Sequence, residues 1–352
     1  MNNVKVIIWG LGAMGAGMAD LLLSKKGVDI VGVAGREGKV GKSMYEFLET
    51  KRGDRPDIII GLPEDVIKEK AADVVLLCTD SFTAKGFDRL KFCLEKKINV
   101  VSIAEEMSYP AAQQPELAKQ LDQIAKANGV SVVGTGINPG LIMDMLVIIM
   151  TGCCWDIKHI TSRRVNSLSP FGASVMKEQG IGITEEEFRD GVKTGKLSGH
   201  VGFPESIAMI ADAIGWKVDK VTQSMEPIVT DVDRKSAHGF AKAGNVAGCA
   251  MKAQGYVNGE IKIEMDHPQQ IEPEQVGVKT GDYVIIKGKP DVNMVNSPEV
   301  PGGIGTIAMC VNMIPHVINA RPGLKTMIDL PVPRAILGDM RDLIDEDAKI
   351  VK

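Results

Sequence analysis

Near its start the chain reads Val4-Lys5-Val6-Ile7-Ile8-Trp9-Gly10-Leu11-Gly12-Ala13-Met14-Gly15, and this stretch decides the fold. The first half is an apolar, β-branched run that predicts a buried strand, and the second half has the spacing G-x-G-x-x-G directly before a helical pattern. The first glycine permits a tight turn, the second lets a pyrophosphate approach the backbone, and the third lets the helix pack on the strand. Because free N–H groups at a helix start attract an anion, we expect a dinucleotide to bind here, at Gly10, Gly12, Ala13, Met14 and Gly15.

The first part of the chain, to about residue 134, alternates short β-branched runs with helix-length amphipathic stretches. The expected strands are Val4–Trp9, Ile30–Ala34, Asp57–Ile60, Asp73–Cys78, Asn99–Ile103 and Val130–Val133. The expected helices cover residues 14–26, 43–51, 64–71, 83–97 and 115–128. This alternation is typical of βαβ units, so we predict an α/β fold with a Rossmann-type, doubly wound parallel sheet over residues 1–140.

The rhythm changes after residue 140, where longer alternating segments predict a second α+β domain with a mainly antiparallel sheet over residues 141–302. Its expected strands are Lys158–Val165, Lys217–Val229, Glu260–Met265 and Asp282–Lys287. Thr184 with Glu187 forms a capping box, and Pro204 suits a first helical turn. A C-terminal segment, residues 303–352, is helical in period until Pro315, and we expect it to pack back on the first domain.

Composition excludes several functional classes. Lys and Arg total 41 against 45 Asp and Glu, a formal net charge of −4, so no basic surplus points to a nucleic acid or an anionic membrane. Six cysteines without a C-x-x-C pair suggest reduced thiols and no metal site. No apolar run is long enough for a bilayer span, and we expect a cytoplasmic protein.

The residue that selects the dinucleotide is expected about 20 residues after the glycines, at the end of the second strand. That place reads Ala34-Gly35-Arg36, without the acid that holds the ribose hydroxyls of NAD. Arg36 can pair with the 2′-phosphate of NADP or stack on adenine, and neither role excludes NAD. Nearby, Gly41-Lys42-Ser43 ends like a phosphate-binding P-loop, but Arg36 stands where that motif needs glycine.

Polar residues follow the later strands, at the sheet edge where chemistry gathers in open α/β folds. Cys78 and Thr79 end one strand, and Asn138 with Pro139 follows another, so we expect these four residues to meet the nicotinamide end of a cofactor. Between them, Glu105 or Glu106 is the candidate catalytic carboxylate. In the alternative interpretation both glutamates only cap the next helix.

Substrate contacts are expected from the second domain. Arg163 and Arg164 are adjacent in a strand-like run, so only one can face a ligand, and we select Arg163 together with Asn166. The turn Gly199-His200-Val201-Gly202-Phe203-Pro204-Glu205 offers His200 and Glu205, and Asp144 is a further carboxylate. The remaining histidines are isolated in sequence, and we expect each to be an ordinary core or surface residue: His159, His238, His267 and His316.

Four motifs together resemble the 2,4-diaminopentanoate dehydrogenase family over nearly the whole chain. They are residues 10–15, Ala104-Glu105-Glu106, residues 134–140 and residues 199–205. That family is related to native amine dehydrogenases and, in its first domain, to dihydrodipicolinate reductases, although this chain lacks the adjacent histidines of the latter. The resemblance implies a homodimer, with an active-site glutamate that falls on Glu105 or Glu106.

The same resemblance implies an activity in ornithine degradation. It is oxidation of 2,4-diaminopentanoate at its C4 amine to 2-amino-4-oxopentanoate and ammonia, with NAD or NADP, and 2,5-diaminohexanoate is a related substrate. Because an alkylamine is protonated at neutral pH, a carboxylate must accept its proton before hydride leaves. Asp144 or Glu205 would hold the C2 ammonium. The alternatives are another NAD(P)-dependent amino-acid or semialdehyde enzyme, and a dinucleotide-sensing protein without catalysis.

Overall fold

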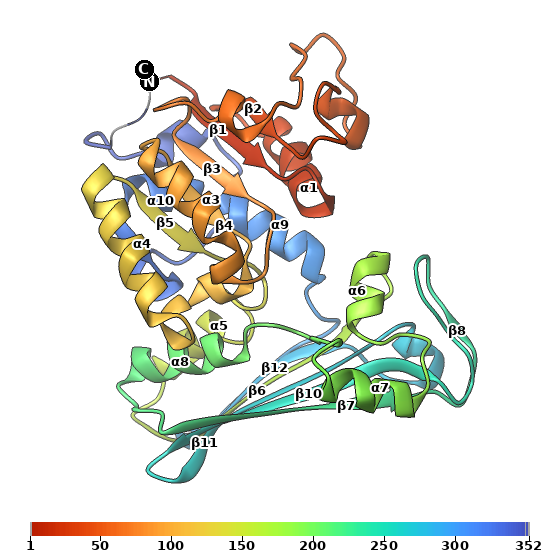
Figure 1. Cartoon of the computed structure of the whole chain (residues 1–352). Coiled ribbons are helices and arrows are strands. Elements are labelled where there is room, and N and C mark those ends of the chain that lie inside the picture. Colours follow the sequence, from red (N-terminus) through yellow and green to blue (C-terminus); the bar gives the residue numbers. More distant parts are fainter. Residues whose placement is uncertain (1, 349, 351–352) are drawn as a thin grey trace. The chain divides into compact units, whose positions relative to one another are not determined.

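The apolar run Val4–Trp9 forms strand β1 of a parallel sheet in the computed structural model (Figure 1). The structure describes residues 2–348 and 350, and within them this sheet has six strands in the order β14-β5-β4-β3-β1-β2. Most of its side chains are buried, which fits strands that carry helices on both faces. The other strands are β2 (Val28–Ala34), β3 (Val74–Leu77), β4 (Asn99–Ser102), β5 (Ser131–Gly134) and β14 (Gly323–Lys325).

Helices between these strands complete the Rossmann-type fold that the alternation predicts. α1 (Ala13–Leu23) packs against α9 (Gly302–Asn312), and α3 (Thr83–Glu95) packs against α4 (Pro115–Asn128) (Figure 1). The period break at Pro315 separates α9 from α10 (Ile314–Asn319), because proline fits a first helical turn and not a helix interior.

The prediction of a strand at Asp57–Ile60 is wrong. Only single bridges form there, between Ser43 and Ile59 and between Ala34 and Gly61. Prolines at 56 and 63 flank the run and limit its length, and the Ile59 side chain is 53% exposed, so the run lacks the cover of a buried strand. The sixth strand comes instead from β14, in the C-terminal segment.

Two helices expected nearby are much shorter than predicted. Residues 43–51 contain only the 3-10 helix Met44–Phe47, and residues 64–71 contain only the end of α2 (Pro63–Val66). Lys70 has a positive φ of 54°, which a helix cannot contain. Residues 43–51 and 64–71 therefore form mostly turns, and not the two full helices that their periodicity predicts.

The second sheet is mainly antiparallel, as predicted. Within the described residues its order is β13-β12-β6-β11-β10-β7, and only the β6–β11 pair is parallel. The sequence prediction missed β10, where Gly248 and Gly255 interrupt the alternation. The strands are β6 (Asp156–Ser167), β7 (Lys220–Val229), β10 (Val246–Val257), β11 (Glu260–Gln270), β12 (Gly281–Lys289) and β13 (Val292–Asn296), and the short pair is β8 (Arg234–Lys235) with β9 (Phe240–Ala241).

Four helices accompany the second sheet. They are α5 (Met145–Thr151), α6 (Ala173–Glu178), α7 (Glu185–Lys193) and α8 (Phe203–Ile214). The predicted capping box is present at the start of α7, where Thr184 Oγ1 accepts from Glu187 N at 3.2 Å. Pro204 lies in the first turn of α8, also as predicted.

The chain divides into two compact units, residues 1–140 with 302–352 and residues 141–301. The C-terminal segment belongs to the first unit, where Lys25 Nζ donates to Ile336 O at 2.6 Å and Met340 N donates to Lys26 O at 3.0 Å. No helix in the described part of the chain is long and apolar enough to cross a membrane.

Replacing Gly134 with alanine should destabilise the first unit. A Cβ atom at Gly134 would lie 2.2 Å from the Met107 carbonyl carbon, a backbone atom that cannot move aside cheaply. We expect Gly134→Ala to lower the free energy of unfolding by about 1–3 kcal/mol in urea titrations, as overpacking does. The control is Gly338→Ala, where a Cβ meets nothing within 4 Å. Equal stability of the two variants would contradict the close approach.

Candidate functional site

The glycine-rich turn has the geometry that its spacing predicts. Gly10 has a φ of +101°, and a Cβ there would lie 2.6 Å from Cys78 O. At Gly15 a Cβ would lie 2.0 Å from Gly10 O, whereas at Gly12 it meets nothing within 4 Å. No side chain caps the start of α1, so its N–H groups and the open side of Gly12 leave room for an anion.

Arg36, Cys78 and Thr79 follow β2 and β3 at the same edge of the sheet. Arg36 is exposed. Burial raises the pKa of the Cys78 thiol to about 12, so this cysteine is neutral and contributes a packing surface. Thr79 Oγ1 donates to Asp80 Oδ2 at 2.8 Å, and Asp80 also accepts from Arg89 Nη1 at 2.5 Å.

The two adjacent glutamates have different environments. Glu106 is 5% exposed, and its Oε2 accepts from Thr83 N at 2.7 Å. Since Phe82 at the N-cap of α3 has no side chain that can cap the helix, the Glu106 carboxylate caps it from a distant segment. Glu105 begins the 3-10 helix Glu105–Ser108 and is half-buried. Glu106 therefore has a structural role, because it caps α3, the helix that precedes it in sequence. Glu105 remains as the candidate catalytic carboxylate.

The loop over residues 135–140 is held in place by α9. Ile137 N donates to Thr306 Oγ1 at 3.2 Å, and Cys310 Sγ contacts Thr135 O at 3.7 Å. Asn138 is half-buried and Pro139 is buried. A segment more than 160 residues further along the chain thus fixes the loop that the sequence predicts at the nicotinamide end.

Alternation on β6 separates the two adjacent arginines. Arg164 is 2% exposed, and it donates through Nη1 to Asp282 and through Nη2 to Val300 O at 2.6 Å. Arg163 lies on the opposite face, where it pairs with Asp266 at 2.8 Å and lies over the Tyr283 ring. The buried polar face therefore contains Arg164, whereas Arg163, the arginine selected from the sequence, lies on the other face in an ion pair with Asp266.

Asn166 and His200 meet a histidine that sequence reasoning treated as ordinary. His267 Nε2 lies 2.9 Å from Asn166 Oδ1, and the rings of His267 and His200 are 4.8 Å apart between centroids. Phe203 packs against His200 with the ring centroids 5.6 Å apart. We call Arg164, Asn166, His200 and His267 the polar cluster. One sequence signal could have identified His267: it lies two residues after Met265 on β11, so both side chains point to the same buried face.

Both histidines of the polar cluster are neutral near pH 7. Burial and the positive charge of Arg164 lower the pKa of His200 to about 4. The same two causes, with the neighbouring His200, lower the pKa of His267 well below its usual value. His267 Nδ1 is buried without a hydrogen-bond partner among the described residues. A buried nitrogen in this state costs free energy unless a ligand or water satisfies it.

The two acidic candidates of the second unit are fully buried. Asp144 accepts from Met145 N at 2.6 Å, which caps α5, and from Ser206 Oγ of α8 at 2.8 Å, so it joins the starts of the two helices. Glu205 lies in the first turn of α8, where an acid is favourable to the helix dipole. The structure thus gives each acid a local structural role.

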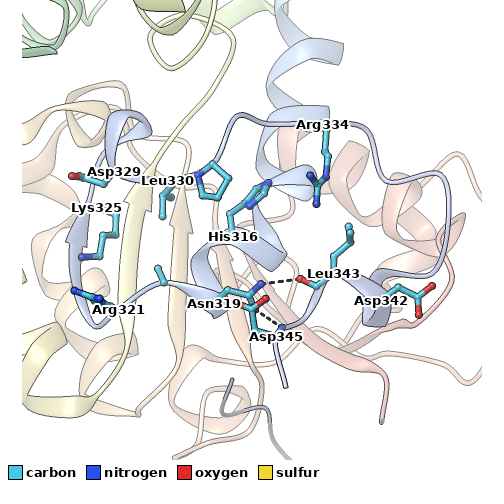
Figure 2. Close-up of a pocket in the computed structure, with 12 residues that line it drawn as sticks. His316, Asn319, Arg321, Lys325, Asp329, Leu330, Arg334, Asp342, Leu343 and Asp345 are labelled. Atoms are coloured by element: carbon cyan, nitrogen blue, oxygen red, sulfur yellow. Dashed lines mark hydrogen bonds between the residues drawn. The ribbon is translucent and has the colours of Figure 1, made fainter. Parts of the chain in front are cut away.

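A cavity of about 600 Å³ lies within the C-terminal segment of the first unit (Figure 2). The imidazole of His316 lies among three basic and three acidic side chains there, so the cavity favours neither sign of ligand charge. None of the candidate residues lines it. The charged residues are Arg321, Lys325, Arg334, Asp329, Asp342 and Asp345.

Comparisons with known proteins point to one family. The family model of the 2,4-diaminopentanoate dehydrogenase C-terminal domain matches residues 141–346. The 2,4-diaminopentanoate dehydrogenase of Acetoanaerobium sticklandii is 76% identical over 353 residues, covering all of both chains. An amine dehydrogenase of Streptomyces virginiae is 22% identical over 239 residues, 63% of this chain and 66% of the relative.

Solved structures share the fold. The amine dehydrogenase of Mycobacterium smegmatis superposes with a TM-score of 0.84 at 24% identity, covering 96% of this chain and 98% of the other. A probable dehydrogenase of Thermotoga maritima has a TM-score of 0.57 at 14% identity, with 93% and 92% covered.

The lowered pKa of the half-buried His200 predicts a pH dependence of stability. Its pKa is about 4 in the folded chain against 6.5 ordinarily, so the unfolded chain binds more protons between these values. Stability from this group is therefore complete above pH 6.5 and is lost as pH falls toward 4. We expect His200→Asn to remove on the order of 2 kcal/mol of this dependence in urea titrations from pH 7 to pH 4.5. The control is the exposed His238, and an unchanged pH profile in His200→Asn would contradict the lowered pKa.

Proposed function

Because the chain belongs to the 2,4-diaminopentanoate dehydrogenase family, we propose that it oxidises 2,4-diaminopentanoate at the C4 amine with NAD or NADP. Water enters, the products are 2-amino-4-oxopentanoate and ammonia, and the dinucleotide is reduced. The observation that carries the proposal is 76% identity along the whole length to a relative of that name. An identity this high leaves little room for a different reaction on the same fold.

The first unit supports a dinucleotide through its own residues. The open side of Gly12 and the uncapped start of α1 suit a pyrophosphate, and Arg36 suits either the adenine or a 2′-phosphate. The loop at Asn138 and Pro139, held by α9, suits the nicotinamide end. A bound nicotinamide would supply the hydride acceptor, and the protein's task is to orient it.

Glu105 is assigned as the proton acceptor. An alkylamine has a pKa near that of lysine, about 10.4, and holds its lone pair as an N–H bond at neutral pH. Removal of that proton by a carboxylate frees the lone pair that lets hydride leave the adjacent carbon. Glu106 is assigned a structural role instead, since its Oε2 accepts from Thr83 N and caps α3. Once that proton has passed to solvent, the Glu105 carboxylate would stabilise the cationic imine and orient the water that attacks it.

The polar cluster of the second unit is assigned to the substrate carboxylate. The positive charge of Arg164 acts on both histidines, and the field that disfavours their protonation also attracts an anion. A neutral imidazole donates one hydrogen bond, and a carboxylate accepts several. This assignment replaces the expected clamp by Arg163, whose guanidinium is paired with Asp266 on the other face.

A panel of amines tests the proposed function directly. We expect the purified protein to reduce NAD or NADP with 2,4-diaminopentanoate, with kcat/KM at least about 10² higher than with pentan-2-amine. The reason is that pentan-2-amine has no carboxylate. When it binds, the groups of the polar cluster that would pair with a substrate carboxylate stay unpaired. Formation of reduced nicotinamide is followed by absorbance. A faster reaction with an amine lacking the carboxylate would contradict the proposal.

Paired glutamine variants test the proton acceptor. Glu105→Gln should lower kcat by about 10² or more with dinucleotide affinity nearly unchanged, because the amide cannot accept the amine proton. Glu106→Gln should act mainly on stability, because a neutral amide caps α3 more weakly. Steady-state kinetics and urea titration of both variants separate the two effects. Wild-type turnover in Glu105→Gln would remove this residue from the chemistry.

A further inference from the structure

The loop after β2 gathers three basic residues beside the glycine-rich turn. Lys39 N donates to Arg36 O at 2.9 Å, and Lys42 N donates to Lys39 O at 3.2 Å, so two successive turns bring these residues together. We call Arg36, Lys39 and Lys42 the basic loop. Its backbone is fixed to the neighbouring segment, where Gly41 N donates to Ile60 O at 2.9 Å.

Lys39 connects the basic loop to the dinucleotide turn. Its Nζ donates to Leu11 O at 2.5 Å, and Leu11 lies between the first two glycines of the turn. The same ammonium lies 4.1 Å from the centre of the Phe47 ring, which holds it by a cation–π contact. A positive charge therefore stands at the side of the turn that faces β2. Among the described residues, this side-chain contact with the turn is made by Lys39.

The segment over residues 36–42 contains three cations and one acid, Glu37. Among residues 2–348 and 350, none of its three cations forms an ion pair with a carboxylate. Burial, followed by the charges of Arg36 and Lys42, lowers the pKa of Lys39. Like charges held together in this way are relieved when an anion binds among them.

The place of the basic loop identifies the anion. In doubly wound sheets the ribose next to the adenine lies at the end of the second strand, where NAD-selective proteins carry an acid and this chain carries Gly35-Arg36. We propose that Lys39, together with Arg36, binds the 2′-phosphate of NADP, and that Lys39 decides how strongly NADP is preferred over NAD. This inference rests on the proposed function only in that the glycine-rich turn binds a dinucleotide. Arg36 supplies a planar fork for the phosphate oxygens, and Lys39 supplies a compact charge anchored on the turn.

Binding titrations without substrate test the role of Lys39. The full-length wild type, Lys39→Met and Lys42→Met are titrated with NADPH and with NADH, and nicotinamide fluorescence gives each Kd. Methionine keeps the apolar stem against Phe47 and removes the charge. We expect Lys39→Met to raise the Kd for NADPH about tenfold or more and the Kd for NADH less than about twofold, as loss of one charge-assisted contact predicts. Lys42→Met, the matched control, should change both Kd values less than about threefold, and Lys39→Arg should keep most of the NADPH affinity.

Three outcomes would overturn the inference. Equal weakening of NADPH and NADH by Lys39→Met would assign Lys39 to a group common to both cofactors. If Lys42→Met changes the ratio of the two Kd values as much as Lys39→Met does, the preference comes from the general positive charge of the loop and not from a specific contact of Lys39. If Lys39→Met changes neither Kd, Lys39 does not bind the 2′-phosphate. If Lys39→Met does not fold, Lys39→Gln takes its place in the same comparison. A wild type that binds neither cofactor would overturn the proposed function as well, whereas retained NADH binding with an unchanged ratio overturns this inference alone.

Discussion

The hydrogen bond from Thr83 N to the buried Glu106 carboxylate is the constraint on which the catalytic assignment depends. It joins the start of α3 to the segment after β4, two places that are neighbours only because β3 and β4 are adjacent parallel strands. The helix gains a cap that Phe82 cannot provide, and the segment gains a fixed course. The backbone of Met107 then lies against Gly134 so closely that no side chain fits there. Glu105 is thus presented from a short, rigid turn and not from a free loop.

The rigid position of Glu105 matters because proton transfer requires a carboxylate at hydrogen-bond distance from the reacting nitrogen. The adjacent glutamate supplies part of that rigidity, so the two identical side chains have different surroundings, and we assign them different roles. The same division separates Arg163 from Arg164, where the pleat of β6 puts one guanidinium on each face. The more buried members, Glu106 and Arg164, bond to Thr83 N and Asp282. Of the glutamates the half-buried Glu105 is the candidate proton acceptor, and of the arginines the buried Arg164 is the candidate for the substrate carboxylate.

The second unit places unusual polarity on the inner face of a sheet. Arg164 is satisfied by Asp282 and Val300 O, yet its charge still acts on two neutral histidines. His267 keeps a buried nitrogen without a hydrogen-bond partner in the part of the chain that the structure describes. Gly199, with a φ of +60°, turns the chain so that His200 N reaches Met251 Sδ, and a Cβ at Gly199 would lie 2.5 Å from that sulfur. A core without function would favour apolar residues at these positions, because each unpaired polar atom costs stability. The polar cluster is therefore explained by a ligand more readily than by folding.

The sequence by itself determined the parallel sheet, the glycine-rich turn, the pair of candidate glutamates and the family, because strand period, turn glycines and local motifs are properties of neighbouring residues. It also predicted the capping box at Thr184 and the break at Pro315 for the same reason. Only the tertiary structure decided that Glu106 caps α3, that Arg164 faces inward, that His267 meets His200, and that β14 supplies the sixth strand. Each of these depends on segments far apart in the chain: Thr83 with Glu106, Arg164 with Asp282, and β14 with β5. Local periodicity cannot specify which distant group satisfies a buried charge or completes a sheet edge, since that choice is made when the layers pack.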